Sequence, residues 1–318
     1  MIVVVGAGFL GLSCALRLAG AGHAVRVLAR DPLGGTTSAT SGAVWFPYLA
    51  EPRERVLAWA AATRLALERI AREAPESGVV VREALVLGSA AGAEPPWWAS
   101  AVAEWRPAGA EELPAACVNG TVFRTAVAET PRYLPWLVAR LGEAGVEVEW
   151  GRQAGSLAEA GRAAGLVVNC AGLGARELAG DESLVPVRGQ TALVAPFGLE
   201  RVVIDERDPA RPTYLVPRRE DCVVGGTAER GDWRLEPDAA TTREILERAA
   251  ALVPGLRGAR LLGARVGLRP SRPGVRLELE RGATGPPVVH CYGHGGAGLT
   301  LSWGCADEVA ALVHGALV

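Results

Sequence analysis

The stretch IVVVGAGFLGLSCALRLAG at residues 2–20 decides the fold of this chain. Its first four residues are apolar and β-branched, which predicts a buried strand at 2–5. Apolar residues then recur at helical spacing, which predicts a helix over 9–20. The segment AVRVLA at 24–29 predicts a second strand. Together these segments predict a βαβ unit at the start of the sequence.

The turn between the first strand and the helix has the pattern G-x-G-x-x-G, at residues 6–11. Gly6 permits the tight turn, Gly8 lets the backbone approach a pyrophosphate, and Gly11 lets helix and strand pack closely. The phosphates then lie at the positive end of the helix. A chain with 40 glycines can contain this pattern by chance. The strand before it and the helix after it supply the context that a dinucleotide site requires.

Two further segments extend the predicted site. Arg30 and Asp31 lie near the tip of the second strand, and Asp31 stands 20 residues after Gly11, where a ribose-binding acid is expected. The motif alone does not distinguish NAD from FAD, but the hydroxyl-rich loop at 34–43 can follow a phosphate and close under a flat ring. The residues expected to contact the cofactor here are Gly6, Ala7, Gly8, Phe9, Leu10, Gly11, Arg30, Asp31, Thr36, Thr37, Ser38, Gly42, Ala43 and Val44.

The composition limits the other classes of function. The chain has 318 residues, 49% of them hydrophobic and 21% charged, so it can bury a sizeable core and is not wholly disordered. A formal net charge of −2 argues against the basic surface that nucleic-acid binding needs. No apolar run is long enough to cross a membrane. We expect a soluble cytoplasmic protein and leave its oligomeric state open, with a homodimer as one option.

The cysteines do not predict a metal site. The two closest of the six cysteines are Cys291 and Cys305, 14 residues apart, so neither a CxxC pair nor zinc-knuckle spacing is present. The sequence also lacks an HExxH motif. We therefore expect no metal, and the sequence leaves open whether any two thiols pair.

The order of predicted elements indicates a domain built from separated segments. Strands and helices alternate at both ends, whereas residues 185–290 are rich in β-branched residues and turns. We predict an α/β fold with a Rossmann-like cofactor domain from residues 1–50, 133–185 and 286–318. Residues 51–132 and 186–285 then form an inserted substrate-binding domain with an antiparallel or mixed sheet.

The chain resembles the bacterial D-amino-acid oxidases, FAD enzymes of the superfamily that includes the glycine oxidases and D-aspartate oxidases. The resemblance runs through the whole chain, and its last segment is the most specific signature. It rests on GAGFLGLSCALRL at 6–18, LARD at 28–31, TTSATSGAVWFPY at 36–48, LVVNCAGLGA at 166–175, PVRGQ at 186–190, YLVP at 214–217, GLRPSRPGVRLE at 267–278 and HCYGHGGAGLTLSWGCA at 290–306.

The resemblance implies a function and its catalytic residues. Non-covalently bound FAD would take a hydride at N5 from a D-amino acid. The imine would then be released and hydrolysed to a 2-oxo acid and ammonia, and oxygen would take the electrons from the reduced flavin to give hydrogen peroxide. Arg269 matches the arginine that binds the substrate carboxylate, and Tyr214 matches a tyrosine that assists it. The Gly296 carbonyl would accept a hydrogen bond from the substrate amine. Because hydride transfer from the neutral amine needs no general base, we interpret His294 as structural.

The same resemblance implies the remaining contacts. The turn and helix start at 295–300 would place backbone N–H groups at the edge of the flavin ring. Phe46 lies at the side-chain end of the substrate pocket, and it cannot pair a second carboxylate, so we expect neutral, apolar D-amino acids to be preferred. The additional cofactor contacts are Ala154, Gly295, Gly296, Gly298, Leu299 and Thr300, and the substrate pocket comprises Phe46, Tyr48 and Val216.

Three alternatives stay open at this point. The first is another amine oxidase of the same superfamily, acting on D-aspartate, glycine or sarcosine. The second is a nicotinamide-dependent dehydrogenase, which uses the same fingerprint. The third is a catalytically inactive subunit that binds FAD or a nucleotide, against which the presence of both Arg269 and Tyr214 argues.

Overall fold

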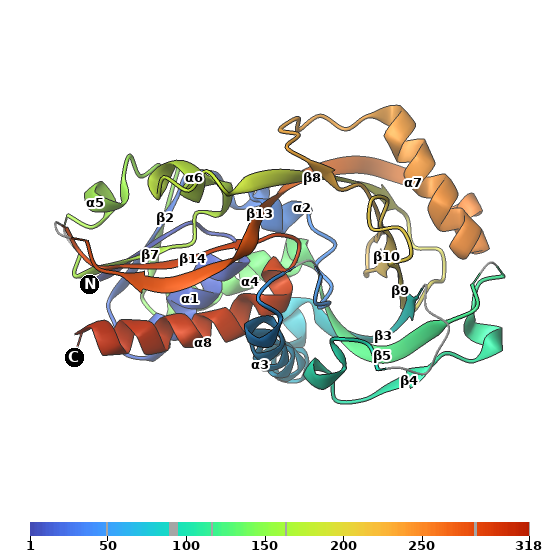
Figure 1. Ribbon diagram of the computed structural model, residues 1–318, viewed down its shortest axis with the longest axis horizontal. Coiled ribbons are helices and arrows are strands. Elements are labelled where there is room, and N and C mark those ends of the chain that lie inside the picture. Colours follow the sequence, from blue (N-terminus) through green and yellow to red (C-terminus); the bar gives the residue numbers. More distant parts are fainter. Residues whose placement is uncertain (49, 89–94, 116, 163, 283–284, 318) are drawn as a thin grey trace.

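The computed structural model describes residues 1–318 except 49, 89–94, 116, 163, 283–284 and 318. Within these residues, the strands form one continuous sheet of 14 strands (Figure 1). Its order is β4-β5-β3-β9-β10-β11-β8-β13-β14-β7-β1-β2-β6, and β12 pairs with β8 beside this path. The strands are β1 (Ile2–Val5), β2 (Val25–Ala29), β3 (Val79–Leu87), β4 (Trp105–Pro107), β5 (Gly120–Ala128), β6 (Glu147–Trp150), β7 (Leu166–Asn169), β8 (Val185–Val194), β9 (Val202–Asp205), β10 (Thr213–Pro217), β11 (Cys222–Gly225), β12 (Glu229–Arg230), β13 (Leu261–Glu280) and β14 (Val288–His294).

The helices begin and end close to where the sequence pattern predicts. The helix expected at 9–20 is observed at those residues, and the helix start expected within 295–300 is observed at Gly298. A proline, Pro131, stands in the first turn of the helix that begins at Thr130, where its missing N–H costs no hydrogen bond. The α-helices are α1 (Phe9–Gly20), α2 (Thr37–Thr40), α3 (Arg53–Glu73), α4 (Thr130–Glu143), α5 (Leu157–Ala160), α6 (Ala175–Leu178), α7 (Ala239–Leu252) and α8 (Gly298–Leu317).

One end of the sheet is parallel and forms the predicted Rossmann-like half. Strand β1 pairs in parallel with β2 and with β7, and the parallel region continues to β6 on one side and β14 on the other. Alternate residues of β1 face opposite sides of the sheet. Val4 lies in the core cluster with α1 and α8, whereas Val5 lies in a second cluster with α5. Both faces are therefore covered, as a parallel sheet requires.

The other half of the sheet is mainly antiparallel and corresponds to the predicted inserted part. Strands β8, β9, β10, β11 and β13 pair antiparallel in the order given above, while β3 joins β9 in parallel. Helix α7 covers this half, with Ile245 and Ala249 in a core cluster with Leu215 and Val224 (Figure 1). The α/β fold with a mixed-sheet insertion is confirmed.

Strand β13 joins the two halves because it is long enough to belong to both. Its first part pairs antiparallel with β8, and its second part pairs antiparallel with β14. Arg269 lies just before the change of partner. The sheet therefore places Arg269 next to the last strand of the cofactor half and the turn that follows it. The predicted domain boundaries stay a prediction, since the sheet passes through them without a break.

Candidate active site

A cavity of about 1230 Å³ runs between the two halves of the sheet. This exceeds the usual volume of small-molecule pockets and suits a dinucleotide together with a substrate. The lining includes most of the predicted site residues, which come from segments far apart in the sequence. Those that line it are Gly6, Ala7, Gly8, Phe9, Leu10, Arg30, Asp31, Thr36, Thr37, Ser38, Gly42, Ala43, Val44, Phe46, Tyr48, Ala154, Tyr214, Arg269, Gly295, Gly296, Gly298 and Leu299.

The glycine-rich turn shows why larger residues would not fit. Gly6 has a φ of +108°, a backbone conformation that L side chains rarely adopt, and a Cβ there would collide with the Cys170 carbonyl. A Cβ at Gly11 would collide with the Gly6 carbonyl, so Gly11 permits close packing although it does not line the cavity. The different glycine roles expected of a dinucleotide fingerprint are therefore visible in the backbone.

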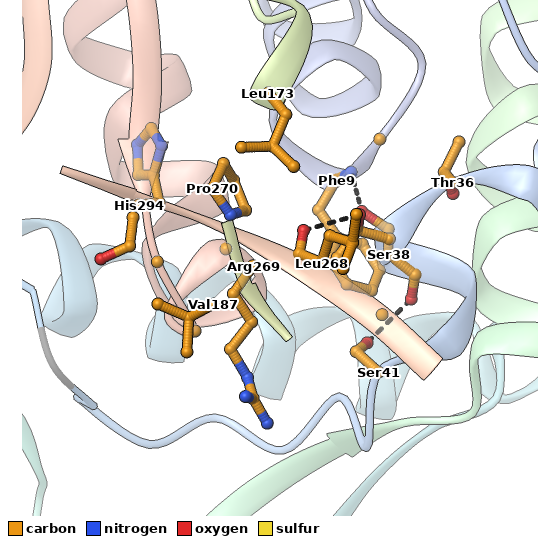
Figure 2. A pocket seen from close by; sticks show the side chains of 18 of the residues that line it. Phe9, Thr36, Ser38, Ser41, Leu173, Val187, Leu268, Arg269, Pro270 and His294 are labelled. Carbon is orange, nitrogen blue, oxygen red and sulfur yellow. Dashed lines mark hydrogen bonds between the residues drawn. The ribbon is translucent and has the colours of Figure 1, made fainter. Parts of the chain in front are cut away.

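The start of α1 is suited to hold a pyrophosphate. Its N-cap is Gly8, which has no side chain to occupy the space in front of the first N–H groups. The Phe9 N–H donates a 3.0 Å hydrogen bond to Ser38 Oγ, which fixes the hydroxyl-rich loop beside the helix (Figure 2). Thr37 Oγ1 in turn donates to the Leu268 carbonyl at 3.0 Å. This loop thus connects the phosphate end of the cavity to β13.

The far end of the cavity carries the residues predicted for the adenosine side. Arg30 and Asp31 form an ion pair of 2.7 Å with each other, in which Arg30 is exposed and Asp31 is half-buried. Ala154 lines the same cavity. The pair presents a donor and an acceptor together, so the two assignments for the ribose contact stay alternatives.

Arg269 occupies the opposite end of the cavity. Its guanidinium lies against Gly189 of β8, where a Cβ would be only 2.5 Å from Cζ and Nη2. Its Nη1 donates to the Thr227 carbonyl at 2.8 Å, which leaves the planar group held on one side. Figure 2 shows the Arg269 side chain extending away from the loop that carries Ser38. A half-buried, oriented guanidinium of this kind suits a carboxylate, because its fork can donate two parallel hydrogen bonds.

Two tyrosines belong to the same end. Tyr214 lies on β10 opposite Gly225, and a Cβ at Gly225 would collide with the Tyr214 ring. The Tyr48 hydroxyl is buried and has no hydrogen-bond partner among the described residues. Burial raises the pKa of Tyr48, Arg269 counteracts the rise, and Tyr214 adds to it. The three groups are therefore close enough to interact, and the unpartnered hydroxyl indicates a place for a polar ligand.

Comparison with known protein families decides the family. The family described as FAD dependent oxidoreductase matches residues 1–312. The chain belongs to this FAD-dependent oxidoreductase family. Its cofactor is accordingly FAD, and the glycine-lined turn and the open helix start described above fit the pyrophosphate of that cofactor.

Individual relatives of this FAD-dependent oxidoreductase agree with the family match. The chain is 53% identical to a D-amino-acid oxidase of Rubrobacter xylanophilus, with 99% of this chain and 96% of the relative covered. It is 39% identical to the human D-aspartate oxidase, over 98% of this chain and 94% of the relative. The fold is similar to that of glycine oxidase from Geobacillus kaustophilus, with a TM-score of 0.82, 19% identity, and coverage of 98% and 94%. Among the described residues, no helix has the length and apolarity to span a membrane.

Two residues that the sequence analysis placed in the site, Val216 and Thr300, lie behind the cavity wall. Val216 is buried in the core beneath Gly42, where a Cβ at Gly42 would lie 3.5 Å from Val216 Cγ2. Thr300 is buried, and its hydroxyl accepts from the Phe46 N–H at 3.0 Å and donates to the Phe46 carbonyl at 2.9 Å. Thr300 therefore positions Phe46. Val216 and Thr300 point away from the cavity because successive side chains along a strand or a helix point to different faces.

His294 lines the cavity, and its ring packs beside a cysteine. It is buried, and its Nε2 lies 3.4 Å from the Cys305 thiol. The fold brings two groups of donors together, Cys14 with Cys170 and Cys291, and Cys291 with His294 and Cys305, each with its atoms within 4.8 Å. Sequence spacing could not reveal these groups, because the five residues come from α1, the segment after β7, β14 and α8. All six thiols are free and buried.

The sequence missed three residues of the cavity end. Gly189 and Gly225 provide flat surfaces for Arg269 and Tyr214, as described above. Gly189 stands in the PVRGQ segment, which carried the resemblance, but no pattern linked it to Arg269. Glu206 lines the cavity after β9 and belongs to no motif. Only the pairing of strands brings these positions to the site.

Proposed function

We propose that this oxidoreductase oxidises D-amino acids to 2-oxo acids, with the release of ammonia and hydrogen peroxide. One observation carries the proposal: Arg269, Tyr214 and the unpartnered Tyr48 hydroxyl converge in the cavity, at the end opposite the predicted adenosine side of FAD. A guanidinium flanked by phenols matches the α-carboxylate of an amino acid. The relatives named D-amino-acid oxidase support the same substrate class.

The side chains of the protein bind and orient the substrate. The guanidinium of Arg269 pairs with the carboxylate, and the two phenol hydroxyls donate to it. The Gly296 carbonyl accepts from the substrate amine, which must be neutral so that its lone pair can assist loss of the hydride. FAD supplies the acceptor for that hydride. The iminium that results loses an N–H proton to give the imine, which water hydrolyses to the 2-oxo acid and ammonia. Molecular oxygen takes up the two electrons together with two protons and leaves as hydrogen peroxide.

Orientation is the main catalytic contribution of the chain in this reaction. Holding the carboxylate and the amine fixes two substituents of Cα, and only one enantiomer then directs its hydrogen toward the cofactor. No side chain is required as a general base, which agrees with the buried contact between His294 and Cys305. Phe46 packs edge-on against Trp98, with ring centroids 5.7 Å apart, and lines the cavity. This apolar wall supports neutral D-amino acids as substrates.

D-Aspartate is expected to be a poor substrate although the human D-aspartate oxidase is a relative. Phe46 provides no charge for the second carboxylate. Arg53 also lines the cavity, but it is 66% exposed and lies 3.5 Å from the Glu51 carboxylate. An exposed, already paired arginine is a weak partner for a substrate carboxylate.

The experiment is a comparison of hydrogen peroxide release from D- and L-amino acids by the FAD-loaded protein. We expect turnover of neutral D-amino acids and none of their L-isomers. Acid denaturation should release the yellow colour into the supernatant, since we propose that FAD is bound non-covalently. A fully FAD-loaded protein that oxidises no D-amino acid contradicts the proposal. The cytoplasmic location and the homodimer stay predictions.

A further inference from the structure

One acidic side chain in the cavity has no counter-charge. Glu206 follows β9, its backbone N–H donates to the Leu87 carbonyl at 3.3 Å, and its side chain lines the cavity. No ion pair or hydrogen bond of its carboxylate is found among the described residues. The two arginines that follow Glu206 in the chain pair with other acids, since Arg207 lies 2.8 Å from Asp205 and Arg211 lies 2.9 Å from Asp208.

Burial in the cavity has a clear effect on this carboxyl group. Desolvation raises the pKa of Glu206 to about 7, and no other cause contributes. A carboxylate that is desolvated without a partner is unfavourable unless a cation or donor satisfies it. The structure thus holds an acid near its titration point inside the substrate cavity. Such groups concentrate at functional sites.

Tyr48 lies near both Glu206 and the expected carboxylate site at Arg269. The pKa of Tyr48 is lowered by Arg269 and raised by Glu206, so the phenol lies within reach of both charges. Both Glu206 and Arg269 line the cavity, and no ion pair joins them among the described residues, where the printed partner of Arg269 is the Thr227 carbonyl. An elongated substrate can therefore place its α-carboxylate at Arg269 and the end of its side chain at Glu206.

We propose that Glu206 binds the cationic end of a substrate side chain, so that D-arginine and D-lysine are substrates of this enzyme. The inference rests on the proposed function and specifies its substrate class. The aliphatic part of such a side chain packs on the apolar wall near Phe46, and its cation reaches the acid. Acidic side chains are repelled by the same group, which adds to the exclusion of D-aspartate. Neutral side chains are accepted but do not use Glu206.

The test compares substrates that differ in charge and little else. D-Citrulline has nearly the shape of D-arginine without its positive charge, and D-norleucine lacks the ammonium group of D-lysine. We expect kcat/KM to be higher for the charged member of each pair. Glu206→Gln should lower kcat/KM for D-arginine by about 10- to 100-fold, the range for a hydrogen bond to a charged group, and change that for D-citrulline by less than about threefold.

A matched control is available two residues along the chain. Asp208→Asn makes the same change of charge in the same segment, but Asp208 is 46% exposed and already paired with Arg211. This variant should preserve the ratio of kcat/KM for D-arginine to that for D-citrulline. FAD content and thermal unfolding of all variants are measured in parallel, so that a folding defect is not taken for a loss of specificity.

The pH dependence adds a second readout. Glu206 becomes charged as the pH rises through about 7. The ratio of kcat/KM for D-arginine to that for D-citrulline should therefore rise between about pH 6 and pH 8 and stay flat in Glu206→Gln. The ratio removes the titration of the α-amine, which both substrates share. Of the other titratable groups, Tyr48 interacts electrostatically with Glu206, while Asp205 and Asp208 flank it in the chain as ion pairs with Arg207 and Arg211, and Arg230 lines the same cavity; these ion pairs and Arg230 keep their charge over this range.

The outcomes distinguish the two proposals. If D-citrulline and D-norleucine are oxidised but the ratio to their charged partners is the same in Glu206→Gln and in the parent, the role of Glu206 is wrong and the proposed function stands. If no D-amino acid is oxidised by the FAD-loaded protein, both proposals are overturned. A charge preference that is lost in Glu206→Gln and retained in Asp208→Asn supports the inference.

Discussion

A methyl group at position 189 tests the placement of Arg269 without removing any atom from it. Gly189 lies on β8, two residues from the strand partner of Arg269. A Cβ there would be 2.5 Å from Cζ and Nη2 of Arg269, whereas ordinary contact begins at 3.4 Å. In Gly189→Ala the guanidinium must therefore move by about 1 Å, or the two strands must separate.

The size of the effect follows from this displacement. A misplacement of about 1 Å in a binding group can lower the rate about 10²-fold. Arg269→Ala sets the upper limit, because an unpaired carboxylate in the cavity costs about 3–5 kcal/mol, roughly 10²- to 10³-fold or more in kcat/KM. Arg269→Lys should recover only part of that loss, since an ammonium group lacks the planar fork. We expect Gly189→Ala to lower kcat/KM for a neutral D-amino acid about 30- to 100-fold.

The assay is steady-state hydrogen peroxide release, with FAD occupancy and thermal unfolding measured on the same preparations. Gly258→Ala is the matched control, because a Cβ at Gly258 meets no atom within 4 Å. The control should stay within about twofold of the parent, as expected for a substitution without steric conflict. If Gly189→Ala binds FAD fully and its kcat/KM stays within about threefold of the parent, Arg269 does not hold the carboxylate in the way described.

Two other substitutions test the surroundings of the site. Tyr214→Phe should raise the activation barrier by about 1–3 kcal/mol, because one hydrogen bond to a charged group is lost, and FAD content should not change. Steady-state kinetics with a neutral D-amino acid measures this effect. A loss as large as that of Arg269→Ala would be inconsistent with an assisting role. Burial opposes ionisation of Asp181, but hydrogen bonds from Ser183, Arg272 and Tyr292 outweigh it and hold the pKa of Asp181 below its usual range. Because this carboxyl is more acidic in the folded state, its stabilisation is present at neutral pH and is lost as the pH falls below about 4. Asp181→Asn should thus lower the free energy of unfolding by about 1–3 kcal/mol at pH 7, and this difference from the parent should shrink in acid. Urea unfolding at several pH values measures both effects. An equal difference at pH 7 and pH 3 would contradict the argument.

The sequence by itself determined the Rossmann-like half of this protein. The strand, the glycine turn and the helix at 2–20 were predicted because their signals are local, namely β-branched residues, helical periodicity and a glycine pattern of fixed spacing. Arg269 and Tyr214 were also predicted from sequence, through segments that resemble a family, and both line the cavity. In both cases each prediction rests on a short segment whose residues are close neighbours in the chain.

Only the tertiary structure decided which side chains meet in the cavity. Glu206 and Gly189 carry no local signal, and they reach the site because β9 and β8 pair with distant strands. Val216 and Thr300 show the reverse, since neighbours in their segments line the cavity but their own side chains lie behind its wall. A sequence pattern shows which type of residue a position needs. Which face it presents, and which distant group it contacts, follow from strand register and packing across the whole sheet.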